Sequence, residues 1–134
     1  MKKLVIFEPL IFFSQADEQA FFFGLKYIQA IRKVHRLPGK PMEDIPNELV
    51  LELRQGKLDD ASLYELIGLM YRYSLDMTGL AQFCTKKNSV YLKDKQKYWY
   101  KAIFGAKPKR TSRYKAATGK RIRSVDGNLT KGFR

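Results

Sequence analysis

The side chains that most often carry catalysis are scarce in this sequence, and their spacing assembles no reactive site. There is one histidine, His35, and one cysteine, Cys84. His35 lies on or just beyond the apolar side of a predicted helix, so a partly buried structural role is expected for it. Cys84 follows Phe83 at the end of a short apolar segment, which is typical of a small core residue rather than a nucleophile with a nearby base.

Carboxylates and glycines show no catalytic pattern either. The adjacent pair Asp59 and Asp60 is explained by capping of the helix that follows. Potential metal ligands do not occur at the tight spacing of a metal site, and no glycine-rich phosphate loop follows a predicted strand. We therefore expect no cofactor, no bound metal and no enzymatic activity, but a function carried by surfaces that bind a partner.

One predicted surface is acidic, within a chain whose net charge is +13. Residues 43–65 carry seven carboxylates against two cations. Such a block is either a solvated face or a docking surface that attracts a basic partner protein through complementary charge. Aromatic anchors carry much of the binding energy of such surfaces. The contacts expected for docking are five carboxylates and two aromatic side chains: Glu48, Glu52, Asp59, Asp60, Glu65, Phe22 and Tyr64.

Two further predicted surfaces are basic. Lys93, Lys97 and Lys101 recur every four residues on a predicted helix, with Tyr100 beside them. This lysine stripe is either a solvated face or a contact for a nucleic-acid backbone. The tail is the second basic surface, because residues 105–134 hold ten cations and one acid. Its expected contacts with RNA or DNA are Arg110, Arg113, Tyr114, Lys120, Arg121 and Arg123.

Length and composition describe one globular domain with a basic extension. A chain of 134 residues with 45% hydrophobic and 29% charged side chains can bury a core, and one cysteine excludes an intramolecular disulfide. The apolar run near the start ends at Glu8 and Pro9, too early for a signal peptide, and no run reaches the ~20 apolar residues of a membrane span. We expect a cytoplasmic protein with a core domain over residues 1–105 and a tail over 106–134, disordered when free.

The core is predicted to have an α+β fold. Residues 3–7 are β-branched and aromatic-rich, which predicts a strand buried on both faces. Residues 48–54 place Leu49, Leu51 and Leu53 on one face and Glu48, Glu52 and Arg54 on the other, which predicts a second strand with one apolar face. Residues 33–37 either end the first helix or form a short strand. These patterns favour a small antiparallel sheet of two or three strands, covered by about four helices.

The first predicted helix follows the capping residue Ser14 and runs from about residue 15 to about residue 31. Phe23 and Tyr27 fall on its broad apolar side, whereas Phe22 falls among its polar residues. Phe22 is therefore a candidate exposed anchor.

Three more helices are expected further along the chain. One follows Asp59 and continues to about residue 73, with apolar residues at helical spacing. A short helix carries residues 80–83 and begins at Asp76 or Thr78. A last helix begins at residue 88 or 89 and places three apolar side chains on one face: Leu92, Trp99 and Ile103.

Three stretches of the core resemble a known class of protein. They are Phe7-Glu8-Pro9 with Phe12-Phe13; residues 63–73 with Asp76-Met77 and residues 80–83; and residues 98–101 with Ile103-Phe104-Gly105. Together they resemble small bacterial immunity proteins of contact-dependent-inhibition and polymorphic toxin systems, over residues 1–105. The resemblance implies a cytosolic protein that binds one toxin domain and occludes its active site, without catalytic residues of its own. The alternative hypothesis is an RNA- or DNA-binding accessory protein that uses the tail and the lysine stripe.

Overall fold

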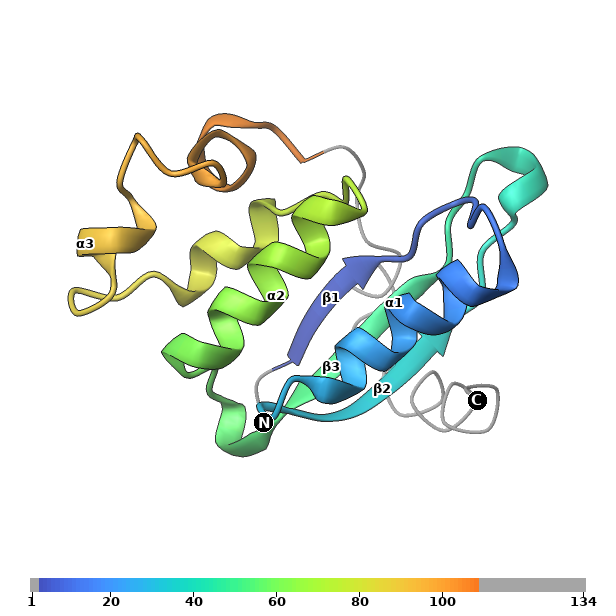
Figure 1. Cartoon of the computed structure of the whole chain (residues 1–134), viewed down its shortest axis with the longest axis horizontal. Helices are drawn as coiled ribbons and strands as arrows, with labels where there is room; N and C mark the ends of the chain where they lie inside the picture. Colours follow the sequence, from blue (N-terminus) through green and yellow to red (C-terminus); the bar gives the residue numbers. More distant parts are fainter. Residues whose placement is uncertain (1–2, 109–134) are drawn as a thin grey trace, which may run out of the picture.

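A three-stranded antiparallel sheet forms one layer of the molecule. The computed structural model describes residues 3–108. Strands β1 (Lys3–Phe7) and β2 (Ile31–Leu37) both pair with β3 (Glu48–Leu53), which lies between them (Figure 1). The α+β prediction is confirmed, and residues 33–37 belong to a third strand rather than to a helix end.

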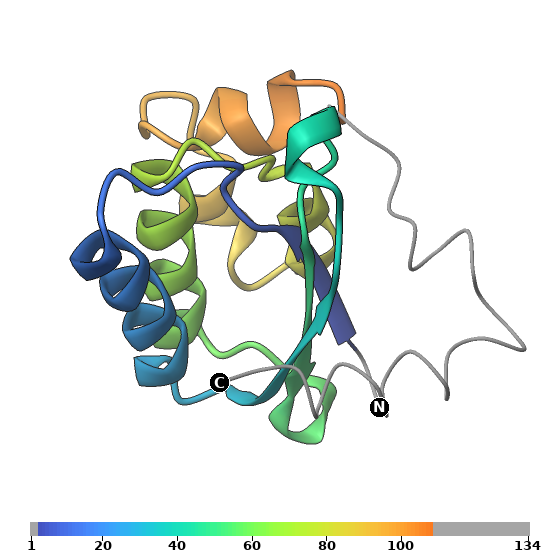
Figure 2. The same cartoon turned by 90° about the vertical axis from the view of Figure 1, so that its right-hand side faces the viewer.

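Helices α1 (Gln15–Tyr27) and α2 (Asp60–Arg72) lie on the same side of this sheet (Figure 2). Their predicted caps are confirmed. The hydroxyl of Ser14 accepts the backbone N–H of Asp17 at 3.1 Å, and the Asp59 carboxylate accepts that of Ser62 at 3.4 Å. The two helices run antiparallel, and the Tyr73 hydroxyl after α2 donates to the Asp17 carboxylate in the first turn of α1 at 3.2 Å.

The core lies between the sheet and the helices. Leu49, Leu51 and Leu53 of β3 are fully buried in it, as the alternating pattern predicts. In β1 the side chains of Leu4 and Ile6 are buried, but the residues between and beside them are only partly buried. The prediction that β1 is buried on both faces is therefore wrong, because successive side chains of a strand point to opposite faces and the helices cover one of them.

Helix α1 is shorter than the sequence pattern predicts. It ends at Tyr27, Ile28 has extended backbone angles, and the apolar residues after it belong to a turn and to β2. The apolar pattern continued because a buried strand follows the helix directly. In the observed helix Phe22 is buried, with 9% of its surface exposed, whereas Phe23 and Tyr27 are 73% and 67% exposed. The prediction is thus reversed for these three side chains.

The C-terminal part of the core is a series of short turns rather than one long last helix. After the 3-10 segment η3 (Thr78–Phe83) come α3 (Ser89–Leu92) and the π-helical turn η4 (Lys101–Gly105). The chain folds back between them, and the indole N–H of Trp99 donates to the Leu92 carbonyl at 2.9 Å. The predicted start of the last helix is confirmed, because α3 begins at Ser89. Its predicted continuation to Ile103 is wrong, although its three apolar residues are all buried.

Two shorter 3-10 turns complete the described chain: η1 (Pro41–Glu43), in the loop before β3, and η2 (Arg54–Gly56), between β3 and α2. Because η2 follows β3 directly, α2 starts at the end of the molecule opposite η1 (Figure 1).

Candidate protein-docking site

Four of the seven predicted docking residues lie together on the N-terminal half of α2. We call Asp59, Asp60, Tyr64 and Glu65 the acidic corner; all four are exposed. Asp59 is the N-cap, and Asp60 lies in the first helical turn, where the positive end of the helix dipole favours a carboxylate. Helix α2 therefore presents these three carboxylates and one aromatic ring to solvent at one end of the molecule.

The aromatic ring of the acidic corner is held in place by its neighbours. Tyr64 stacks on Tyr91 with ring centroids 5.3 Å apart and meets the Trp99 ring edge-on at 5.5 Å. The Tyr91 hydroxyl donates to the Asp60 carboxylate at 2.9 Å. Tyr91 comes from α3, so the corner joins two segments that are 27 residues apart in sequence at this pair. Tyr64 keeps almost half of its surface exposed and is preorganised to contact a partner.

The pKa values of this corner follow from the same contacts. Burial raises the pKa of Tyr91 to about 12, helped by the hydrogen bond to the Asp60 carboxylate. The hydrogen bond from Ser62 holds the pKa of Asp59 below its ordinary value. At neutral pH Asp59 is therefore ionised and the Tyr91 hydroxyl is protonated and able to donate.

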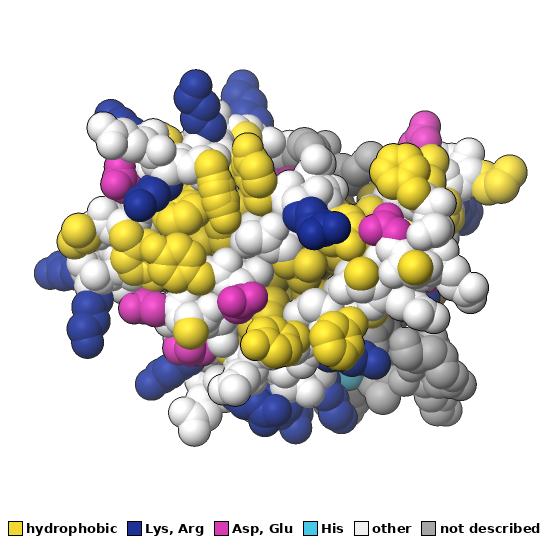
Figure 3. Space-filling view, viewed as in Figure 1, with side chains coloured by type: hydrophobic (Ala, Val, Ile, Leu, Met, Phe, Trp, Pro, Cys, Tyr) yellow, Lys and Arg dark blue, Asp and Glu magenta, His cyan; other side chains and the backbone are white. Residues whose placement is uncertain are grey.

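A shallow groove continues from the acidic corner between the two long helices. This α1–α2 groove has a volume of about 480 Å³. Apolar side chains gather over α1, α2 and the neighbouring turns on this face, with carboxylates beside them toward the start of α2 (Figure 3). The groove is lined by Phe23, Gly24, Tyr27, Tyr64, Glu65, Gly68, Leu69 and Arg72.

The groove contains residues that the sequence pattern did not assign to a surface. Phe23 and Tyr27 were expected on the buried side of α1, because its apolar arc was extended through the residues of β2. Gly68 and Arg72 carry no local signal of a surface role. If the end of the helix had been placed at Tyr27, Phe23 and Tyr27 would have been assigned to the surface.

The other three predicted docking residues do not belong to this site. Phe22 is in the core, where it packs edge-on against Phe21 at 5.1 Å. Glu48 of β3 is fully buried and is not on the molecular surface. Their assignment as docking contacts is a wrong prediction, because helix α1 is rotated relative to the predicted arc and strand β3 is central in the sheet.

Glu52 is a structural carboxylate of the sheet rather than a docking charge. Arg32 donates to one of its oxygens at 2.7 Å, and Nε2 of His35 lies 2.6 Å from the other. Burial alone would raise the pKa of Glu52, but the hydrogen bonds from His35 and Arg32 outweigh it, and the pKa lies below its ordinary value. His35 is buried on β2, so its structural role is as expected, although it lies on a strand and not beside a helix arc.

The lysine stripe is exposed but does not lie on one helix. Lys93 follows α3, Lys97 lies in the turn beyond it, and Lys101 starts η4. The ammonium of Lys93 lies 5.6 Å from the centre of the Phe104 ring, which also contacts Tyr100. The regular spacing on one helical face is therefore a wrong prediction. The predicted tail contacts lie outside the described residues: Arg110, Arg113, Tyr114, Lys120, Arg121 and Arg123.

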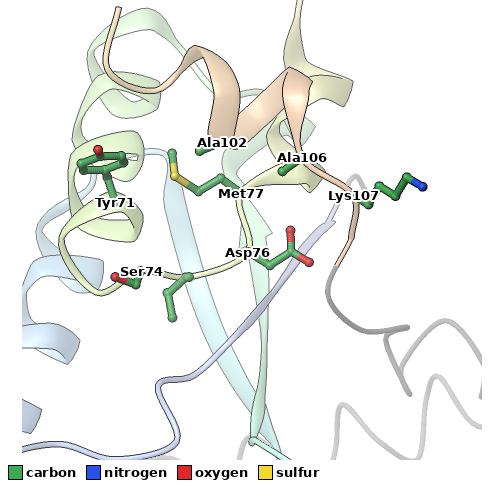
Figure 4. A pocket seen from close by; sticks show the side chains of 8 residues that line it. Tyr71, Ser74, Asp76, Met77, Ala102, Ala106 and Lys107 are labelled. Carbon is green, nitrogen blue, oxygen red and sulfur yellow. The ribbon is translucent and has the colours of Figure 1, made fainter.

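A second hollow, of about 260 Å³, lies between the end of α2 and the turns after Tyr100 (Figure 4). Its floor is largely apolar and includes Met77 and Ala102, while Asp76 and Lys107 lie at its edge. The Asp76 carboxylate accepts both the N–H and the hydroxyl of Thr78, at 3.0 and 2.7 Å, and so holds the start of η3. Among the described residues that line it, the polar side chains are Tyr71, Ser74, Asp76 and Lys107.

Outside these surfaces, residues 3–108 contain one cysteine, Cys84. Cys84 is a partly buried side chain that packs against the core, as expected. No group of three or more potential metal ligands occurs in that range. Among the described helices, none has the length and apolar character needed to cross a membrane.

Comparison of the chain with protein-family models, with curated proteins and with solved structures finds no match.

Proposed function

We propose that this chain is a non-enzymatic, cytosolic immunity-type protein that binds one bacterial toxin domain and occludes its active site. The observation that carries the proposal is the acidic corner, where Asp59, Asp60, Tyr64 and Glu65 meet at an exposed end of α2. The local sequence resemblance to immunity proteins supports the same class of function. The adjoining α1–α2 groove supports it further, because an exposed aromatic patch of this kind is typical of protein interfaces.

The mechanism is steric occlusion guided by charge. The carboxylates of Asp60 and Glu65 attract a basic surface around the toxin's active site and raise the rate of encounter. Tyr64 is then buried against the toxin, and it loses little conformational freedom because Tyr91 and Trp99 already hold its ring. Binding prevents substrate from reaching the toxin, so no bond in this chain has to change.

The test begins with the full chain as bait in its native lysate, at high salt and after nuclease treatment. A captured protein is then expressed alone in a susceptible host, where it is expected to arrest growth. Co-expression with this chain is expected to restore growth. A captured protein that leaves growth unchanged, or whose toxicity this chain does not relieve, contradicts the proposal.

The acidic corner is tested by the double variant Asp60→Lys with Glu65→Lys. We expect association with the captured toxin to slow by about tenfold or more, measured by stopped flow at low salt. The matched control is Glu43→Lys together with Asp44→Lys, since both are exposed acids of the same segment in the loop at the opposite end of the molecule. Equal association rates for the two double variants would remove the acidic corner from the mechanism.

A second candidate function is nucleic-acid binding, which one specific observation favours. Residues 86–107, here called the lysine segment, contain seven lysines and one aspartate, and all seven lysines are exposed. Such a segment neutralises phosphates without reading base sequence. The predicted tail cations would extend it.

The alternative is tested by fluorescence anisotropy of a labelled single-stranded RNA titrated with the full chain. The variant Lys93→Glu, Lys97→Glu, Lys101→Glu is expected to reduce the slope of log affinity against log salt by about 2, at ~0.7 per phosphate contact. The control is Lys33→Glu, Lys40→Glu, Lys57→Glu, a change of equal charge at exposed sites outside the segment. An affinity that does not change with salt concentration contradicts this function. So does an equal loss of affinity in the two triple variants.

A further inference from the structure

The floor of the α1–α2 groove holds a glycine that the fold does not require. A glycine in a helix interior is unfavourable relative to alanine. At Gly24 the reason is visible, because a Cβ there would lie 3.1 Å from Cδ1 of Leu69. At Gly68 a Cβ would meet Tyr98 Oη at 3.9 Å, an ordinary contact. Within residues 3–108, packing therefore explains Gly24 and leaves Gly68 as an open stretch of helix backbone that another helix can approach closely.

Aromatic side chains rise on both sides of this open backbone. Phe23 and Tyr27 of α1 are largely exposed, and Tyr64 and Tyr71 of α2 are about half exposed. Tyr98 packs edge-on against Tyr71 at 4.7 Å and extends the patch beyond α2. On this face apolar side chains gather in several areas, with polar and charged side chains between them (Figure 3). A face of this composition gains stability when a second protein surface covers it.

The charges of the groove are arranged for a second copy of the same helix. Glu65 and Arg72 are both exposed, line the groove and are two turns apart, about 10 Å along the axis of α2. Gly68 and Leu69 lie midway between them. A two-fold axis through that midpoint places Glu65 of each copy opposite Arg72 of the other, so one charge pair is formed twice. Any other partner helix would have to supply a matching pair from a different sequence.

We propose that a second copy of this chain covers the α1–α2 groove, with the two α2 helices antiparallel across a two-fold axis near Gly68. The inference does not depend on the proposed function, because it concerns the chain alone. The homodimer buries Phe23 and Tyr27 of both copies. It also covers Tyr64 and Glu65, which belong to the acidic corner as well.

The test is sedimentation velocity of the full chain over a concentration series, which is expected to show a reversible species of twice the 15.6 kDa of one chain. The variant Gly68→Gln is expected to abolish this species. A Cβ at this position makes only an ordinary contact with Tyr98 Oη, at 3.9 Å, and the rest of the glutamine side chain is expected to fill the place where the second helix approaches. Circular dichroism and urea unfolding confirm that the variant is folded. A chain that stays monomeric at its highest soluble concentration, or a dimer unaffected by Gly68→Gln, overturns the proposal.

Charge reversal tests the two-fold arrangement directly. Glu65→Arg and Arg72→Glu are each expected to raise the dimer dissociation constant by about tenfold, because the symmetry turns two attractive pairs into two repulsive ones. The combined variant Glu65→Arg, Arg72→Glu is expected to restore the dissociation constant to within about threefold of the original, since each pair is re-formed with its charges exchanged. Lys40→Glu, an exposed change of equal charge on the η1 loop, serves as the control. A combined variant as weak as either single variant overturns the arrangement.

Discussion

Asp59 shows how one residue serves both the stability of α2 and the charge of the acidic corner. Its carboxylate accepts the backbone N–H of Ser62, which otherwise has no partner at the start of a helix. The side-chain hydrogen bond from Ser62, together with this backbone bond, favours the ionised form and lowers the pKa of Asp59. The helix is therefore anchored by the same charge that a basic partner would meet.

Replacement of Asp59 separates these contributions. We expect Asp59→Ala to lower the free energy of unfolding by about 1 kcal/mol at neutral pH, because the cap is lost. Asp59→Asn is expected to lose less, since asparagine also caps but carries no charge at the positive end of the helix. Urea unfolding followed by circular dichroism measures both.

The pH dependence of the Asp59→Asn comparison has a definite sign. The pKa of Asp59 is lower in the folded chain than in the unfolded one, so its contribution is fully present above the unfolded pKa, about 3.9. The contribution is lost as the pH falls through the lower folded pKa. The stability difference between the original chain and Asp59→Asn should therefore shrink in acid. A difference that stays constant from neutral pH to strong acid contradicts this account.

Single residues also show what the sequence could and could not predict about the site. Capping chemistry is local, so Ser14 and Asp59 were assigned correctly from neighbouring residues. The partners of Glu52 come from β2, about 20 residues away, and nothing near Glu52 in the chain indicates them. A carboxylate in a charge-rich stretch looks the same whether it meets solvent or a buried histidine.

At the scale of elements, the predicted end of α1, about four residues too late, determined which aromatic side chains were assigned to the surface. The helix, its turn and β2 form one continuous apolar stretch, and helical and strand periodicities overlap where an element ends. Strand β2 then takes its position from pairing with β3, which is 11 residues further on at its nearest end. Strand pairing over that distance in sequence cannot be recognised from the hydrophobic pattern of β2 alone.

The packing of α1 against α2 predicts opposite roles for their two glycines. Gly68→Ala is expected to raise the free energy of unfolding by about 0.5–1 kcal/mol, because alanine favours the helix and its Cβ makes only an ordinary contact with Tyr98. For Gly24→Ala the increase in the free energy of unfolding is expected to be smaller than for Gly68→Ala by at least about 0.5 kcal/mol, because its Cβ is forced against Leu69.

Urea unfolding of the two alanine variants at low protein concentration isolates the single chain from its self-association. The comparison is matched, because both substitutions add one methyl group to the interior of a 13-residue helix. Equal gains at both positions would mean that α1 and α2 are not in close contact at Gly24. A loss of stability at Gly68 would mean that the groove floor is not open.

At the scale of the whole molecule, the layer of two antiparallel helices leaves one face for both proposed interactions. The α+β class was predictable, because Leu49, Leu51 and Leu53 recur at strand spacing in β3 and α2 carries apolar residues at helical spacing. The groove was not predictable, since it arises from the contact of two helices that are 32 residues apart between Tyr27 and Asp59. A surface formed by elements that are distant in sequence can be predicted only once the fold is known, and not from the sequence of either segment.

The shared residues of the two interactions lead to the last prediction. Tyr64 and Glu65 belong both to the acidic corner and to the α1–α2 groove, so a bound toxin and a second copy should exclude each other. Adding the toxin identified by its growth arrest is expected to convert the homodimer into a one-to-one complex, measured by sedimentation velocity. Asp60→Lys should weaken toxin binding and leave the homodimer intact, because Asp60 lies outside the groove, whereas Arg72→Glu should weaken the homodimer alone. A stable complex of two copies with two toxins would show instead that the corner and the groove act as separate surfaces.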